Sequence, residues 1–82
     1  MQEKSLGELL GKIAGRARVV LRASREDADM SQEKLAKVLG WTRHMVANLE
    51  GGRRECRFVD FVAIAWALKV EPERMLRRIL GW

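Results

Sequence analysis

The stretch that decides the fold is MSQEKLAKVLGWTRHMVANLEGGRR, residues 30–54. Ser31 and Thr42 each precede a run with helical spacing, and both are residue types that cap the N-terminus of a helix. Gly40 lies between the two runs, and glycine commonly follows the end of a helix. The stretch therefore predicts two short helices, over about residues 32–39 and 43–50, joined by a tight turn.

The predicted turn, residues 40–42, has the length and the glycine that are typical of a helix-turn-helix motif. Ala36 is small at the point where the two helices must cross closely. Val46 and Leu49 return to the side of the core. These features place a helix-turn-helix over residues 31–51.

The second of these helices has one apolar and one polar face. At about 100° per residue, Arg43, Ala47, His44 and Asn48 cover one side. The other side holds Met45, Val46 and Leu49. Arginine can bond guanine in a bidentate manner and asparagine can bond adenine, whereas the alternative reading is an ordinary solvated helix face.

Upstream, apolar residues recur at helical spacing from about Leu6 to Ala28. Gly7, Gly11 and Gly15 each weaken this helix by roughly 1 kcal/mol relative to alanine, so the stretch is either two helices broken near Gly15 or a frayed start before a firm second half. Asp29 is expected in the left-handed conformation that ends many helices.

Downstream, a basic loop over residues 53–57 precedes two further helices, over about residues 58–68 and 72–80. The chain is thus predicted to be all-α, with five helices in a single domain over residues 1–82. Residues 1–16 form an N-terminal extension of that domain.

The composition of the chain restricts the kinds of partner and site that the protein can have. The chain has 16 basic and 11 acidic residues and a net charge of +5, which fits nucleic acid as partner, although many small proteins are basic without such a role. Cys56 is the single cysteine, so neither an internal disulfide nor a cysteine-rich zinc site is expected, and a reducing cytoplasm fits. The first residues contain acidic side chains and no unbroken apolar stretch, so a signal peptide is not expected, and no apolar run approaches membrane-spanning length.

Enzymatic chemistry is not expected. His44 is the single histidine, and no carboxylate or cysteine cluster accompanies it as a metal site requires. No phosphate-binding loop and no dinucleotide fingerprint is present. We therefore predict no catalytic residues, no metal and no cofactor.

Residues 30–54 resemble the XRE family, the Cro and lambda-repressor type of bacterial and phage regulator. The resemblance covers about residues 17–76 and continues through the apolar positions Phe58, Phe61, Ile64, Ala65, Leu68, Val70 and Met75. The sequence departs from the family pattern at Asp29, Cys56 and Arg57, and its N-terminal extension is longer than usual.

The resemblance implies a lambda-repressor-like fold and a sequence-specific regulator of transcription that binds double-stranded DNA. Its base-reading positions correspond here to Arg43, His44 and Asn48. The residues expected at DNA phosphates are Gln32, Thr42, Arg53, Arg54 and Arg57, with a solvated loop as the alternative for Arg57. Arg25 and Glu50 match positions that the family often pairs between its first and third helices.

Apolar residues beyond the core stripe predict a homodimer on an inverted-repeat operator. The predicted interface consists of Val59, Trp66, Ile79, Leu80 and Trp82. The stretch over residues 6–13 is the competing explanation, since it could cover part of this patch within one monomer. A repressor or autoregulator is the favoured function, and an antitoxin-like module that masks a partner toxin is the alternative.

Overall fold

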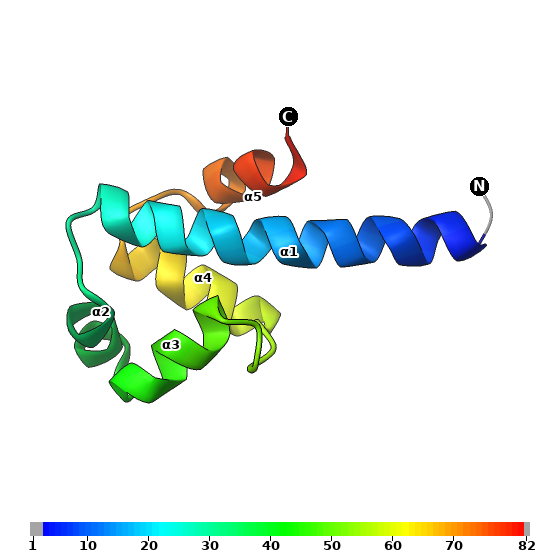
Figure 1. Ribbon diagram of the computed structural model, residues 1–82. Helices are drawn as coiled ribbons and strands as arrows, with labels where there is room; N and C mark the ends of the chain where they lie inside the picture. Colours follow the sequence, from blue (N-terminus) through cyan, green and yellow to red (C-terminus); the bar gives the residue numbers. More distant parts are fainter. Residues whose placement is uncertain (1–2, 82) are drawn as a thin grey trace.

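The computed structural model describes residues 3–81 of the chain. Within them the regular structure consists of five α-helices, which confirms the all-α prediction (Figure 1). Their bounds are α1 Glu3–Asp27, α2 Gln32–Leu39, α3 Arg43–Glu50, α4 Phe58–Ala67 and α5 Pro72–Leu80. The helix α1 runs through Gly15 without a break, so the predicted break into two helices near Gly15 is wrong.

The caps predicted from the sequence are present. The Ser31 hydroxyl accepts a hydrogen bond from the backbone N–H of Lys34 at 3.0 Å, and the Thr42 hydroxyl accepts one from Met45 at 3.2 Å. Gly40 ends α2 with φ 72°, and Asp29 ends the turn after α1 with φ 55°, both left-handed. Because these bonds span three residues or fewer, the sequence alone places the helix-turn-helix within the chain.

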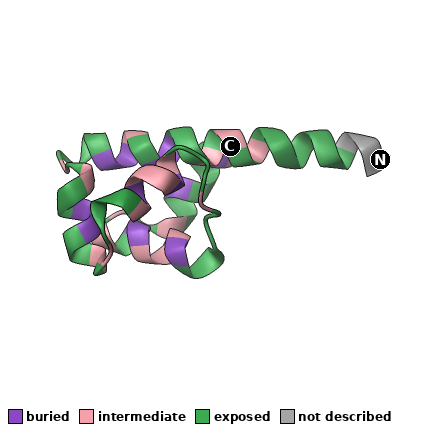
Figure 2. Ribbon diagram, turned by 60° about the horizontal axis from the view of Figure 1, so that its bottom comes forward, coloured by how far each residue is buried: buried purple, intermediate pink, exposed green. Residues whose placement is uncertain are grey.

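The core gathers at the carboxyl-terminal half of α1 (Figure 2). Helices α2, α3, α4 and α5 each contribute buried residues to it, and the side chains are Leu21, Leu35, Ala36, Val46, Leu49, Ile64, Ala65, Leu68 and Met75. Phe58 matches an apolar position of the family but does not belong to the core here, because 81% of it is exposed. It stands at the first residue of α4, a turn before the part of that helix that packs on the core.

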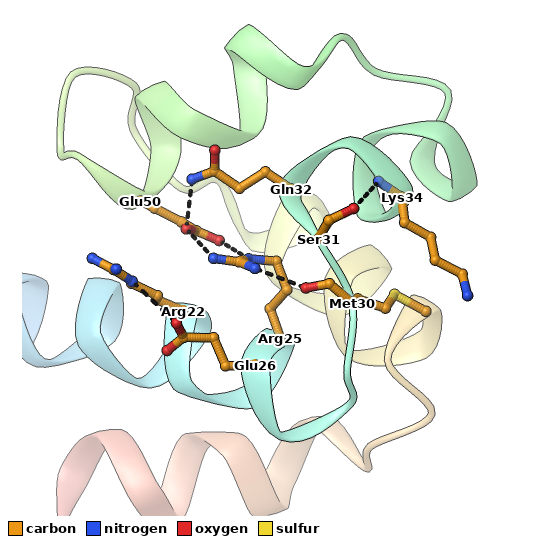
Figure 3. Close-up of polar contacts among 8 residues, drawn as sticks. All are labelled: Arg22, Arg25, Glu26, Met30, Ser31, Gln32, Lys34 and Glu50. Carbon is orange, nitrogen blue, oxygen red and sulfur yellow. Dashed lines mark hydrogen bonds and ion pairs between the residues drawn. The ribbon is translucent and has the colours of Figure 1, made fainter.

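A buried ion pair joins α1 to α3 (Figure 3). The Arg25 guanidinium donates to the Glu50 carboxylate through Nε at 2.7 Å and through a terminal nitrogen at 3.1 Å. Its other terminal nitrogen donates to the Met30 carbonyl at 2.7 Å, and the Gln32 amide donates to Glu50 at 3.0 Å. The hydrogen bond with Glu50 raises the pKa of Arg25 above its usual value. The pairing predicted from the resemblance is confirmed, and it brings three segments of chain to one point.

Helix α5 packs beside α1 and buries part of the predicted dimer interface. Ile79 is only 4% exposed and, with Leu80, lines a groove beside Leu9 and Val20 of α1. Arg78 reinforces this contact by donating to Asp27 and to the Ser24 hydroxyl, both at 3.3 Å. Ile79 is therefore a core residue rather than an exposed one, which corrects the sequence-based prediction. Trp82 lies outside the described residues.

The ion pair gives a stability prediction. Glu50→Ala leaves the Arg25 guanidinium buried without its partner, so the free energy of unfolding should fall by about 3–5 kcal/mol. Urea denaturation measures this loss. Glu26→Ala is the matched control, because Glu26 pairs with Arg22 at 3.7 Å with both side chains largely exposed. It should cost no more than about 0.5 kcal/mol, and equal losses in the two variants would contradict the structural role of Glu50.

Candidate nucleic-acid interface

Helix α3 presents the three predicted base-reading residues on its outer side. Arg43 and His44 are exposed, and Asn48 is half-buried one turn further on. On the opposite side Val46 and Leu49 are 1% and 2% exposed. The burial of Val46 and Leu49 fixes the rotation of α3 about its axis. The side chains of Arg43, His44 and Asn48 therefore face outward together.

Thr42, before α3, and Gln32, at the start of α2, differ in how far their side-chain hydrogen-bonding groups are already used. Thr42 is exposed, and its hydroxyl already accepts the capping bond, so it can still donate to a phosphate oxygen. Gln32 is half-buried, and its amide nitrogen is committed to Glu50. The amide keeps a second hydrogen that the bond to Glu50 does not use.

The loop after α3 folds back on the end of that helix. The Asn48 carbonyl accepts hydrogen bonds from the backbone N–H groups of Arg53 at 2.9 Å and of Arg54 at 3.2 Å. Gly52 allows this reversal because its φ is 80°, a conformation that glycine adopts without strain. The loop therefore holds the exposed Arg53 side chain beside the carboxyl end of α3.

Arg54, predicted at a DNA phosphate, has contacts within the domain that the sequence did not indicate. Its guanidinium lies 4.7 Å from the centre of the Trp41 ring and 3.9 Å from the Asp60 carboxylate. Its Nε atom is buried and has no hydrogen-bond partner among the described residues. A stacked and half-buried guanidinium ties the loop to the turn between α2 and α3, so the structure gives Arg54 a role within the domain.

Arg57 is also engaged within the domain. Its backbone N–H donates to Asp60 at 3.1 Å, and its guanidinium donates to both oxygens of that carboxylate at 3.2 Å. These bonds hold the pKa of Asp60 below its usual 3.8 and raise that of Arg57. Asp60 thus caps the start of α4 in the manner of the third residue of a capping box. The Arg57 side chain is still 67% exposed, so its contact with a DNA phosphate stays a prediction beside its role in this cap.

One basic residue beside this surface was missed in the sequence. A Cβ built at Gly52 would lie 3.0 Å from the Nε of Arg18, so this exposed α1 side chain covers the loop that carries Arg53. Sequence spacing gives no signal for it, because the fold alone brings α1 and the loop together.

Residues 16–78 match the family described as the helix-turn-helix domain. The chain belongs to this family. This family agrees with the XRE-type helix-turn-helix that the sequence resembles, and it is a family of DNA-binding domains rather than of enzymes.

A solved structure has the same fold. It is the clp gene regulator ClgR from C. glutamicum, with a TM-score of 0.77 and 22% sequence identity over 84% of this chain and 90% of that one. No curated protein matches this chain. Among the described helices of this helix-turn-helix protein, none has both the length and the apolar character needed to cross a membrane.

Asp60 gives a pH prediction. Because its pKa is lower in the folded chain than its usual 3.8, its stabilising contribution is complete above that pH and is lost as the pH falls through the folded value. Asp60→Asn should therefore be less stable than the wild type at pH 7 and should lose less stability on acidification below about pH 5.

Urea midpoints measured across this pH range test the prediction. Asp27→Asn is the matched control, since the Asp27 side chain is 69% exposed and water screens its pair with Arg78. Its stability should follow the pH curve of the wild type. If Asp60→Asn also follows that curve, the cap does not depend on the ionised carboxylate.

Proposed function

We propose that this regulator binds a specific double-stranded operator by inserting α3 into the major groove, with Arg43, His44 and Asn48 at the base edges. The observation that carries the proposal is the outward polar face of α3, held in place by buried Val46 and Leu49. An α-helix fits the major groove, where each base pair presents a distinct pattern of donors and acceptors. Arginine suits guanine and asparagine suits adenine.

Phosphate contacts are proposed at the edges of this face. Arg53 is exposed beside the end of α3, and the backbone N–H groups at the start of α2 and α3 attract anions. Gln32 and Thr42 keep a hydrogen to donate there. Arg54 and Arg57 contribute positive charge near the loop, with their guanidinium groups partly used by Asp60.

A homodimer on an inverted repeat is proposed as the form that binds DNA. Trp66 and Val59 of α4 are 71% and 65% exposed, which is unusual for apolar residues of this size on one helix. Leu80 is half-buried, so it stands at the margin of the predicted interface. A two-fold pair would place its recognition helices about 34 Å apart, one turn of DNA.

Repression, including repression of its own gene, is the proposed effect, because a domain bound over a promoter excludes other proteins from it. The cytoplasm is the proposed location, where the exposed Cys56 thiol stays reduced. The exposed Trp66 surface also fits the alternative, an antitoxin that masks a toxin. Selection of bound sequences from random DNA separates the two, since the alternative predicts no enriched operator.

The first functional prediction concerns readout. Arg43→Ala and Asn48→Ala should each cost about 1–3 kcal/mol at the cognate operator and much less on random DNA, because each removes a bond to a base. Competition across single-base variants of the operator measures the preference. If both variants keep the wild-type base preferences, α3 does not read the sequence.

The second functional prediction concerns phosphates. Arg53→Ala should weaken binding to operator and random DNA by similar factors and lower the salt slope by about one unit. Arg77→Ala is the matched control, because it removes the same charge from α5, on the other side of α1 from α3 (Figure 1). A salt slope that is equal in Arg53→Ala and wild type would remove Arg53 from the interface.

A further inference from the structure

A row of arginines lies on the side of α1 that faces the carboxyl end of α3. At about 100° per residue, Arg18, Arg22 and Arg25 fall on one side of the helix. Arg25 is buried in its ion pair with Glu50, the last residue of α3, whereas Arg18 and Arg22 are exposed. Because the buried pair holds this side of α1 against α3, the two exposed arginines lie beside the end of the recognition helix. We call Arg18 and Arg22 the α1 arginine pair.

Arg18 lies against the loop that follows α3. A Cβ built at Gly52 would be 3.0 Å from the Nε of Arg18 and 3.1 Å from its Cδ and its Cζ, so this side chain rests on the bare backbone of the glycine. The next residue, Arg53, is exposed and is already proposed at a DNA phosphate. The ion pairs that α1 makes within the described part of the chain use other residues of this helix. The charge of Arg18 therefore adds to that of Arg53.

Arg22 lies one helical turn from Arg18 and close to the buried ion pair (Figure 3). Its Nε is 3.7 Å from the carboxylate of Glu26, and the two side chains are 65% and 56% exposed. Water screens such a pair, so the contact leaves Arg22 able to bind a stronger anion. Gln32, also proposed at a phosphate, donates to the same carboxylate as Arg25. The α1 arginine pair thus adjoins proposed phosphate contacts on α2 and on the loop.

We propose that Arg18 and Arg22 bind phosphate groups of one DNA strand, at the edge of the groove into which α3 inserts. The inference rests on the proposed function and adds a binding site on α1 to those on α2, α3 and the loop. Residues four apart lie about 6 Å from each other along a helix axis, and the phosphates of one strand recur every 3.4 Å or so along the duplex, that is about 3.4 Å per nucleotide. Two extended guanidinium groups at this spacing reach phosphates one or two nucleotides apart, and each can donate two parallel hydrogen bonds to its phosphate.

A structural role for Arg18 is the competing explanation. A cation beside the carboxyl end of a helix is favourable, because unpaired carbonyl groups there carry partial negative charge. The last carbonyls of α3, however, already accept hydrogen bonds from the backbone N–H groups of the loop, at 2.9–3.2 Å. The loop therefore satisfies the end of α3 without Arg18, and the guanidinium is left to bind a group outside the domain.

The helix α1 also carries a matched arginine on its opposite side. Arg16 is two residues before Arg18, so it points about 160° away from it around the helix axis. Its guanidinium donates to the Arg78 carbonyl of α5 at 3.4 Å, and α5 lies on the side of α1 away from α3 (Figure 1). Removing Arg16 or Arg18 changes the net charge by the same amount. A difference between the two variants therefore reports the position of the charge.

The salt dependence of binding tests the site on one random duplex, with the full chain. Each lost phosphate contact lowers the slope of log K against log salt concentration by about 0.9. Arg18→Gln and Arg22→Gln should each show this loss, whereas Arg16→Gln and the charge-conserving Arg18→Lys should keep the wild-type slope. Thermal midpoints should be equal in Arg18→Gln and wild type. Equal slopes in Arg18→Gln and Arg16→Gln would overturn the proposal, and a lower midpoint with an unchanged slope would assign Arg18 to the end of α3 instead.

Neutral backbone linkages locate the contact on the selected operator. Single methylphosphonate groups remove the charge of one phosphate at a time. On one strand, neutralising phosphates one or two nucleotides apart should weaken binding of wild type and of Arg16→Gln, and should have little further effect on the variant that combines Arg18→Gln with Arg22→Gln. If every linkage weakens the combined variant as much as the wild type, the α1 arginine pair binds no phosphate.

The two proposals fail in different ways. Selection that enriches no operator, with the salt slopes of the α1 variants still lowered on random DNA, would count against sequence-specific readout alone. Lowered slopes in Arg53→Ala but not in the α1 variants would overturn the α1 site alone. Absence of any salt-dependent binding to DNA by the wild type would overturn both.

Discussion

The buried pair between Arg25 and Glu50 is the interaction on which the position of α3, the helix proposed to contact DNA, depends. The planar guanidinium meets both carboxylate oxygens and reaches the Met30 carbonyl as well, so its three hydrogen bonds fix direction as well as distance. Such a pair adds little net stability over an apolar replacement, but leaving one partner alone is costly. Its main effect here is on geometry, because these hydrogen bonds fix the orientation of α3 relative to α1.

A second carboxylate organises the loop after α3. Asp60 is 4% exposed and draws in both Arg57 and Arg54, while Trp41 provides a surface for the Arg54 guanidinium. The arginines of this basic loop therefore have different roles. Two of its arginines hold the loop on the domain, and Arg53 is left exposed beside α3. These contacts, with the hydrogen bonds to the Asn48 carbonyl, hold the loop against the carboxyl end of α3.

Most of the large exposed apolar residues lie on two helices, α1 and α4. On α4, Trp66 and Val59 are exposed, whereas on α5 Ile79 is buried against α1. The long first helix thus covers part of the predicted patch and at the same time exposes leucines of its own. Because α1 both completes the core and projects past it, exposed apolar residues lie along α1 as well as on α4.

The sequence by itself determined the features that rest on local bonds. The caps at Ser31 and Thr42, the left-handed Gly40 and Asp29, and the polar outer face of α3 all follow from neighbours within one or two helical turns. The tertiary structure alone decided the roles of Arg54, Ile79 and Arg18, because their partners come from distant parts of the chain. The type of a charged or apolar residue indicates which groups it can bind. Only the packing of the helices determines which of those groups lies next to it.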